Sequence, residues 1–309
     1  MATDSCMRYI FVFPSKFPSS LTFAEVEQAY RRALSNVQPS TVYTLGHFAI
    51  LKKKEWYDPN AAIVFFRDIP EHIPPDRKAK CAFYYTESVG DPGHLIPYQQ
   101  TLLNYYSSKV HEFDLVFAGT PSAVDFWRPL CRKVALSPLG YDPEVMGSPN
   151  WSREKTHDIG FCGSMLGRRT WVLPAIRNRF GSRYLEIGGI SGKARNEAFD
   201  ACRMMLYIGH SDEKSFAHLR LWSAVSSSAA LVTEERDAWP AVSGRHYISL
   251  LPVEEHNPEA FVDQLAATLK LPLEKIARAM HEEMSPYTAD RCLKEFMIPA
   301  IESLFTRTP

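Results

Sequence analysis

Two adjacent arginines follow a turn that carries glycine and serine in the segment Thr156–Thr170 (THDIGFCGSMLGRRT). The apolar residues before the turn predict a buried strand and those after it predict a helix, whose first N–H groups point toward the turn. Glycine lets the backbone approach a ligand closely, and arginine brings a permanent charge on a planar fork that suits phosphate oxygens. We therefore interpret Gly163, Ser164, Arg168 and Arg169 as a cradle for a diphosphate. The alternative is an ordinary strand–turn–helix with two solvated arginines.

Three titratable side chains lie close together in the segment Thr86–His94 (TESVGDPGH), which follows a strongly apolar run. Glu87, Asp91 and His94 each carry a group that accepts a proton from a hydroxyl when its position and pKa are suitable. We name all three as candidates for a general base, with Glu87 first because it lies nearest the end of the preceding strand. The same residues also suit a plain role in turns and helix caps.

Several segments that resemble known motifs fail when their spacing is checked. Gly188–Lys193 (GGISGK) is not a P-loop, because Ile187 stands where that motif needs its first glycine and Ala194 where it needs Ser or Thr. Phe13–Ser20, after the first predicted strand, contains no glycine, which argues against a dinucleotide-binding dehydrogenase. His281 lacks a second histidine at the spacing of a zinc helix, and the sequence has no Gly-x-Ser-x-Gly elbow. Metalloenzyme and hydrolase functions therefore lose support.

The composition is that of an ordinary globular protein. The chain has 309 residues, 45% of them hydrophobic, and 35 basic residues balance 35 acidic ones. This balance gives no overall basic field, so a nucleic-acid partner is not suggested, although a local patch would still permit a nucleic-acid acceptor. The cysteines lack CxxC spacing, and the sequence shows no signal peptide or transmembrane run. We expect a cytoplasmic, metal-free protein with reduced thiols at Cys6, Cys81, Cys131, Cys162, Cys202 and Cys292.

Short apolar runs alternate with helical patterns, which predicts mostly parallel sheets covered by helices on both faces. The first half has apolar or β-branched runs at Met7–Phe13, Thr41–Leu51, Ala61–Phe66, Cys81–Thr86, Asp114–Ala118 and Lys133–Leu136, and helical patterns at Phe23–Val37, Pro97–Val110 and Pro121–Leu130. The second half has strands at Asp158–Cys162, Tyr184–Ile187, Met204–Ile208, Ala229–Thr233 and His246–Leu250, and helices at Thr170–Phe180, Lys193–Cys202 and Phe216–Ser226. Three helical patterns end the chain at Pro258–Leu269, Leu273–Met284 and Thr288–Phe305.

A domain boundary is predicted between Gly140 and Lys155, where Pro, Gly, Ser and charged residues follow one another without periodicity. We expect two Rossmann-like α/β domains at residues 1–145 and 146–286, followed by a C-terminal helix at 287–309. Ligands of open parallel sheets bind beyond the carboxyl ends of the strands. Further candidate ligand contacts therefore lie where strands of the second domain end, at Gly188, His210, Glu234 and Glu235.

A family resemblance rests on segments spread over about the last two thirds of the chain. The chain resembles CgeB-like glycosyltransferases, the spore-maturation-protein type within the GT-B fold, in the order and spacing of DLVFAGTPS (114–122), PLGYDPE (138–144), DIGFCGSMLGRR (158–169), LRLWSAVSSSAALVT (219–233), GRHY (244–247) and YTADR (287–291). The resemblance implies two Rossmann-like domains facing a cleft, with a nucleotide-sugar donor in the C-terminal domain and an acceptor in the N-terminal one. It also implies no bound metal, no cofactor besides the donor, and a final helix that crosses back to the first domain.

One position departs from the family where the donor is expected. Relatives often show Arg-x-x-Glu-Ala, whereas here Arg220 is kept and Ser223 stands in the place of the glutamate. The family acid is expected near the ribose or sugar of the donor, so Glu234 or Glu235 takes this role, or the donor is handled differently. Ser228 and Ala229 stand where relatives have glycines, which would also fit an inactive, binding-only relative.

We therefore expect a metal-independent glycosyltransferase that moves a hexose or similar sugar from a nucleotide sugar to a hydroxyl acceptor. The departing diphosphate needs fixed positive charge, for which Lys214 and Arg220 are additions to the arginine pair. An inverting reaction requires a base on the acceptor side and a retaining one does not; the sequence does not choose between them, nor among a glycan, a protein, a small molecule and a hydroxylated nucleobase as acceptor. The alternative is a non-catalytic nucleotide- or glycan-binding protein on the same fold.

Overall fold

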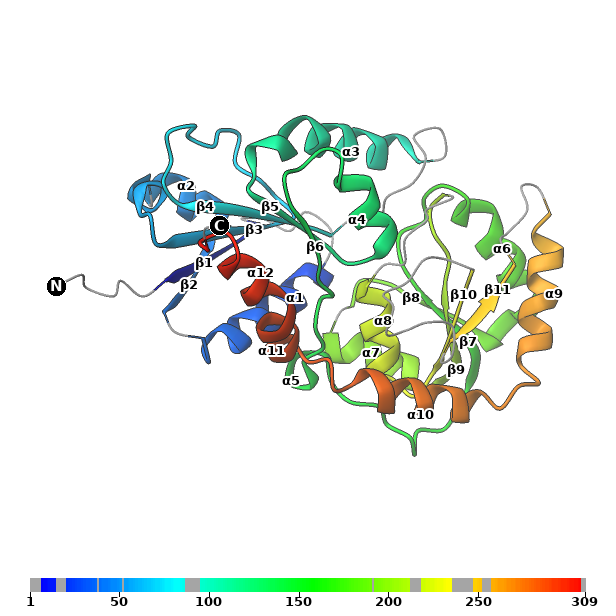
Figure 1. Cartoon of the computed structure of the whole chain (residues 1–309). Helices are drawn as coiled ribbons and strands as arrows, with labels where there is room; N and C mark the ends of the chain where they lie inside the picture. The colour runs from blue at the N-terminus through cyan, green and yellow to red at the C-terminus, as the bar shows by residue number, and fades with distance from the viewer. Residues whose placement is uncertain are drawn as a thin grey trace. The chain divides into compact units, whose positions relative to one another are not determined.

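The computed structural model describes residues 7–14, 21–37, 39–51, 53–86, 95–190, 192–211, 218–234, 247–251 and 257–306. The chain divides into two compact units (Figure 1). The first contains residues 1–89, 99–140 and 288–309, and the second contains residues 90–98 and 141–287. The first unit therefore combines the beginning and the end of the chain, and residues 90–98, which the sequence placed in the N-terminal domain, belong to the second unit.

The first unit is built on a six-stranded parallel sheet with the strand order β2-β1-β3-β4-β5-β6. Its strands are β1 (Arg8–Phe13), β2 (Ser40–Thr44), β3 (Ala61–Phe66), β4 (Lys80–Tyr85), β5 (Leu115–Ala118) and β6 (Val134–Leu136). Its helices are α1 (Leu21–Leu34), α2 (Leu45–Leu51), η1 (Lys53–Tyr57), most of α3 (Pro97–Lys109), η3 (Val110–Glu112), α4 (Pro121–Trp127), α11 (Ala289–Cys292), η6 (Leu293–Met297) and α12 (Ile298–Glu302). The expected single run at Thr41–Leu51 is thus a strand followed directly by a helix.

Aromatic side chains show which helices cover each face of this sheet. Phe65 of β3 and Phe83 of β4 are register partners; Phe65 packs against α2 and η1, and Phe83 packs against α3. The next residues along the strands, Phe66 and Tyr84, stack on each other, and Phe66 contacts Tyr30 of α1. Because successive strand residues point to opposite faces, α2 and α3 share one face of the sheet and α1 lies on the other.

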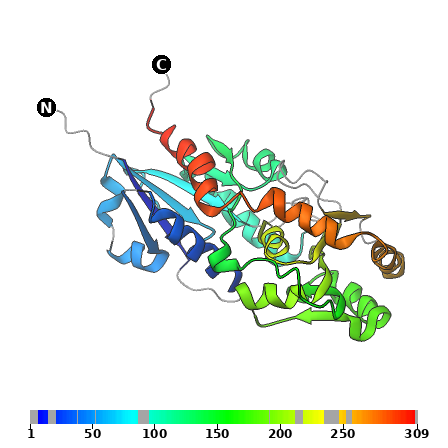
Figure 2. The same cartoon turned by 90° about the horizontal axis from the view of Figure 1, so that it is seen from below.

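The C-terminal segment packs on the first unit, beside α1 (Figures 1 and 2). Tyr9 of β1 donates a hydrogen bond of 2.9 Å from its hydroxyl to Oε1 of Glu302. Any Cβ at Gly140 would overlap the backbone of Ala289, so glycine is required where these two parts of the chain meet. The expected C-terminal helix that crosses back to the first domain is confirmed, although the structure divides it into two short α-helices around a π-helical turn.

The second unit is built on a five-stranded parallel sheet with the order β11-β10-β9-β7-β8. Its strands are β7 (His157–Cys162), β8 (Tyr184–Ile187), β9 (Cys202–Tyr207), β10 (Ala230–Glu234) and β11 (Ile248–Leu250). Its helices are α5 (Pro143–Met146), α6 (Arg169–Phe180), η4 (Gly181–Arg183), α7 (Gly192–Asp200), α8 (His218–Val225), α9 (Pro258–Thr268) and α10 (Leu273–Met284). The expected α/β fold class with two Rossmann-like sheets is confirmed. None of the helices in the described ranges is long and apolar enough to cross a membrane.

Candidate functional site

The candidate site begins at the carboxyl end of β7, where Gly163 follows the strand. Any Cβ placed on Gly163 would lie 3.0 Å from Nη1 of Arg169, 3.0 Å from Cζ of Phe161 and 3.4 Å from Nη2 of Arg220. A glycine therefore leaves the space that two guanidinium groups occupy. Two positive charges this close repel each other, so an anion beside them would be stabilised.

The loop between β7 and α6 is held by the segment that follows β9. Gly167 has a φ of 57°, and any Cβ there would overlap the carbonyl oxygen of His210. The same carbonyl accepts a hydrogen bond of 3.1 Å from the backbone N–H of Arg168. Only glycine combines this left-handed backbone conformation with so close a contact. The local fold thus fixes the residues of the predicted cradle against the neighbouring strand end.

Arg169 is buried and connects the cradle to β9. Only 3% of its surface is exposed. Its Nε donates to the carbonyl of Ile208 at 2.7 Å, and its Nη1 donates to the carbonyl of Ser164 at 3.1 Å. The guanidinium carbon also lies 5.4 Å from the centre of the Phe161 ring, a cation–π contact. Arg169 therefore shapes the loop as well as bringing positive charge to it.

His210 has the tautomer that this network requires. Its Nε2 lies 3.2 Å from Nη1 of Arg169, and because arginine only donates, Nε2 is the acceptor. The proton of the neutral ring is then on Nδ1, which lies 3.5 Å from the carbonyl of Leu166. His210, expected from its place at a strand end, thus lies within the loop network.

Arg168 forms an ion pair with Glu234 at the carboxyl end of β10. Its Nη2 lies 2.5 Å from Oε2 of Glu234, and its Nε donates to the carbonyl of Gly209 at 3.3 Å. The two side chains are 10% and 2% exposed. The sequence named both residues for the donor, and the structure brings them together. The carboxylate offsets part of the positive charge of Arg168.

Arg220 is the cation of this site that the described part of the chain leaves without a partner. It lies in α8, is partly buried, and its side chain forms no hydrogen bond or ion pair with any described residue. Its Nη2 approaches Gly163, as given above. Of the arginines around the turn, Arg220 is therefore the one whose charge is best placed to meet a bound anion.

The other expected residues fall into two groups. Ser164 is exposed in the turn, and Gly188 follows β8, where any added Cβ would meet nothing within 4 Å. No described contact joins Gly188 or the Ser164 side chain to the arginines. Only the backbone carbonyl of Ser164 accepts a hydrogen bond, from Arg169. The remaining candidates lie outside the described residues: Glu87, Asp91, His94, Lys214 and Glu235.

The departures from the family pattern occupy buried positions. Ser223 of α8 is fully buried, and Ser228, before β10, is 2% exposed. Lys155 donates hydrogen bonds of 3.0 Å and 2.6 Å to the carbonyl and the Oγ of Ser228. The serine at position 228 therefore has a hydrogen-bonding role that glycine would lack.

Sequence reasoning did not single out Thr233 as an individual contact. This residue precedes Glu234, is fully buried, and its Oγ1 has no hydrogen-bond partner in the described structure. A hydroxyl at the last positions of a central strand was the available signal, because such side chains lie at the ligand edge of the sheet. In the described ranges, no group of three or more His, Cys, Asp or Glu residues is placed to hold a metal ion.

No family model matches the chain, and no curated protein is similar to it in sequence. Its fold is similar to that of several solved glycosyltransferases. HepE of Anabaena, in complex with UDP and glucose, has a TM-score of 0.64 and 12% identity, over 96% of this chain and 100% of that one. The pneumococcal O-GlcNAc transferase GtfA, in complex with UDP and GlcNAc, has a TM-score of 0.60 and 11% identity, over 84% of this chain. AviGT4, a glycosyltransferase involved in avilamycin A biosynthesis, has a TM-score of 0.59 and 13% identity, over 96% of this chain and 98% of that one.

These similarities show the fold. The chain has the two-domain, Rossmann-like GT-B architecture that the sequence predicted. It spans 60% of the length of GtfA, 57% of the matched chain in the GtfA/B complex and 55% of TarM.

Proposed function

We propose that the protein is a glycosyltransferase that moves a sugar, such as a hexose, from a nucleoside diphosphate sugar to a hydroxyl acceptor. The observation that carries this proposal is the approach of Arg169 and Arg220 to Gly163, with no described partner for Arg220. Because this cluster lies at the carboxyl edge of a parallel sheet, it suits the diphosphate of a donor. GT-B neighbours solved with UDP and a sugar support the same role.

The transfer needs little covalent machinery from the protein. The bond between the sugar carbon and the diphosphate oxygen breaks, and the electron pair leaves with the diphosphate. The acceptor oxygen forms the new bond to the same carbon and loses its proton to a base or to solvent. Arg220 and Arg169 stabilise the leaving charge, which is the contribution that a divalent cation makes elsewhere. We propose that this cationic pair makes the transfer metal-independent.

The finer assignments are also proposals. Arg168, Ser164 and Lys214 complete the diphosphate site; Gly188, His210, Glu234 and Glu235 contact the nucleotide or sugar; and Glu87, Asp91 or His94 is the base. The resemblance in segment order supports a CgeB-like enzyme without a cofactor besides the donor, and the cysteines without CxxC spacing support a cytoplasmic location.

Calorimetric titration with the diphosphates of uridine, guanosine, adenosine and thymidine tests the proposal. We expect UDP to bind, and Arg220→Ala to weaken its binding about 10- to 100-fold, the scale of a hydrogen bond to a charged group. Arg153→Ala is the matched control, because Arg153 is exposed, precedes β7 and its side chain has no described partner. Equal UDP affinity in the two variants would contradict the proposed cradle.

A non-catalytic binding protein is the second candidate, and the absence of the family acid at the buried Ser223 favours it. Hydrolysis of UDP-glucose without an acceptor separates the two functions. A transferase releases UDP slowly by transfer to water, whereas a binding module leaves the donor intact at the same occupancy.

A further inference from the structure

The connection between β3 and β4 contains no helix. It covers residues 67–79, all within the described structure, and includes Pro70, Pro74 and Pro75. Proline removes an N–H donor and interrupts helical hydrogen bonding, so this stretch runs as an irregular chain. Parallel neighbours are usually joined by a helix that packs on the sheet. Between α2 and α3, the sheet face therefore carries a thin connection in place of a helix.

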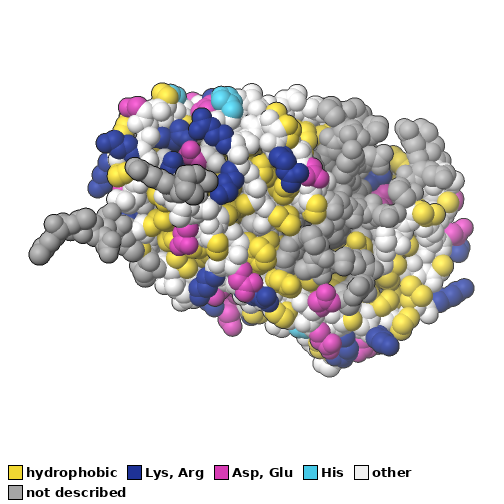
Figure 3. Space-filling model, in the orientation of Figure 1, with side chains coloured by type: hydrophobic (Ala, Val, Ile, Leu, Met, Phe, Trp, Pro, Cys, Tyr) yellow, Lys and Arg dark blue, Asp and Glu magenta, His cyan; other side chains and the backbone are white. Residues whose placement is uncertain are grey.

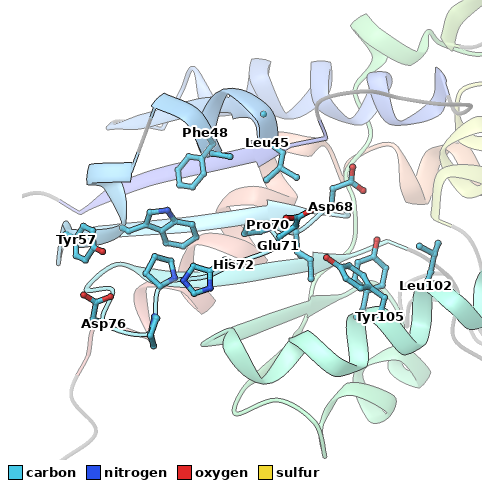
Figure 4. A pocket seen from close by; sticks show the side chains of 17 residues that line it. Leu45, Phe48, Tyr57, Asp68, Pro70, Glu71, His72, Asp76, Leu102 and Tyr105 are labelled. Carbon is cyan, nitrogen blue, oxygen red and sulfur yellow. The ribbon is translucent and has the colours of Figure 1, made fainter.

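This arrangement leaves a cavity of about 970 Å³ within the first unit. Figure 4 shows Leu45 and Phe48 of α2 on one side, Leu102 and Tyr105 of α3 on the other, and the connection between them. Rings supply much of the lining, including those of Trp56 and Tyr106. A cavity of this size and apolar character is typical of sites for small organic ligands.

The carboxylates that line the cavity give it an acidic character. Asp68, Glu71 and Asp76 line it, and among the residues that the structure describes no lysine or arginine does. Lys109 lies nearby, but its Nζ donates to the carbonyl of Glu71 at 3.1 Å and pairs with Glu112 at 3.2 Å. Burial raises the pKa of Asp68, although the charge of Arg67 opposes this. Carboxylates accept hydrogen bonds from hydroxyl groups and disfavour anionic ligands.

A second depression, of about 580 Å³, lies along the same connection and has the opposite character. Its lining includes four basic side chains, Arg77, Lys78, Lys80 and Arg132, against the acidic Glu112 and Asp114, and Lys and Arg side chains gather on part of the surface of this unit (Figure 3). An anionic ligand would favour that surface. The lining of the cavity is acidic and that of the second depression is on balance basic, so an anionic ligand is expected at the second depression and not in the cavity.

The polar groups in the lining of the larger cavity indicate whether it suits a sugar ring or an aromatic ring. A sugar ring carries hydroxyls around its edge and needs many hydrogen-bond partners. The larger cavity offers mainly aromatic and proline surfaces, with its carboxylates and His72 on the connection. An aromatic ring stacks or packs edge-on against such surfaces and needs few polar partners.

We propose that this cavity binds the aromatic part of the sugar acceptor, an uncharged aromatic compound with a hydroxyl group. The role as acceptor rests on the proposed function, whereas the ligand class rests on the cavity alone. Aromatic packing against Trp56 and Tyr105 would supply affinity, and the carboxylates would favour a hydroxyl over an acid.

Binding of three glucosides tests the proposal by calorimetry on the full chain. We expect 4-nitrophenyl glucoside to bind, and 4-carboxyphenyl glucoside and methyl glucoside to bind at least about tenfold more weakly. Ala49→Phe places a ring into the cavity from an exposed position of α2 and should weaken the nitrophenyl compound by at least about tenfold. His47→Phe is the control, because it exchanges an imidazole for a phenyl ring at an exposed position of the same helix that does not line the cavity.

Titration of UDP into the same samples keeps the two proposals distinguishable. Unchanged UDP affinity in Ala49→Phe, with the nitrophenyl compound lost, would support the cavity as a separate site. Equal affinity for the nitrophenyl compound in Ala49→Phe and His47→Phe, or preference for the carboxylate or the methyl glucoside, would overturn the ligand class. Binding of the nitrophenyl compound without any UDP binding would overturn the role as acceptor site and the proposed function, and leave the ligand class standing.

Discussion

Oδ1 of Asp200 accepts two hydrogen bonds from Ser228, one of 2.6 Å from the backbone N–H of Ser228 and one of 2.9 Å from the Oγ of Ser228. Asp200 is 2% exposed, and burial raises its pKa above the ordinary value of 3.8, although these hydrogen bonds and the charge of Lys155 oppose the rise. The pair connects the end of α7 to the turn before β10. It therefore lies where the strands begin, at the edge of the sheet opposite to that of the arginines.

The raised pKa predicts a pH dependence of stability. In the interval above pH 3.8 and up to the folded-state pKa, the folded protein binds more protons at Asp200 than the unfolded chain does. The free energy of unfolding contributed by this group therefore falls as the pH rises through that interval. Urea unfolding across the acid range should show a smaller fall for Asp200→Asn than for the wild type. An identical pH profile in the two proteins would contradict this assignment.

Removing the charge of Glu234 should destabilise the protein through Arg168. Glu234→Gln would leave the nearly buried guanidinium without its carboxylate, and breaking a buried ion pair costs roughly 3–5 kcal/mol when one partner is removed. An isosteric amide should lie at or below the low end of this range. Glu186→Gln is the matched control, because its ion pair with Arg177 is partly exposed and should contribute at most about 1 kcal/mol. Thermal unfolding of both variants gives the comparison; equal shifts would argue against a buried pair.

Gly163 should tolerate no side chain. In Gly163→Ala the new methyl group would press on Arg169 and Phe161 at 3.0 Å, and overpacking of this kind costs roughly 1–3 kcal/mol. We also expect weaker binding of UDP, because the guanidinium groups must move. Gly188→Ala places its methyl group in open space and should leave stability unchanged. Unfolding and titration of both variants check this, and a native-like Gly163→Ala would exclude the close packing described above.

Thiol labelling should report on the cradle. Burial raises the pKa of Cys81, Cys202 and Cys292 to about 12, so these groups remain protonated thiols at pH 8 and react slowly in the folded protein. Cys162 is only partly buried and directly precedes Gly163. In a Cys6→Ser background, iodoacetamide should modify Cys162 first, and UDP should slow this reaction. Mass spectrometry of the labelled peptides locates the site; labelling of Cys162 that UDP leaves unchanged would place the nucleotide elsewhere.

The sequence predicted the elements whose local pattern is unambiguous. The run Ala61–Phe66 forms a strand with the expected bounds, because six buried apolar or aromatic residues suit a strand covered on both faces. The helix Leu273–Met284 also has the expected bounds, since its buried residues recur at helical spacing. The run Thr41–Leu51 was ambiguous, because its apolar residues do not show where the strand ends and the helix begins.

The contacts within the candidate site depend on distant residues. Arg168 and Glu234 are 66 positions apart, and Arg169 and Ile208 are 39 positions apart. Spacing within one segment identified the arginines as a cationic pair, but it carries no information on such partners. The cavity beside the β3–β4 connection was missed for a related reason: the prolines at 70–75 predict a loop, whereas the space beneath a loop depends on the packing of α2 and α3.

The position of the C-terminal segment in the first unit has a consequence for synthesis on the ribosome. The second unit is nearly contiguous in sequence, so its core can close once residue 287 has emerged. The first unit is translated earlier but needs residues 288–302 for the contacts of α11 with α1 and of Glu302 with Tyr9. The part of the chain that is translated first is therefore completed last, and a nascent chain stalled before residue 288 would expose the α1 face of an unfinished sheet.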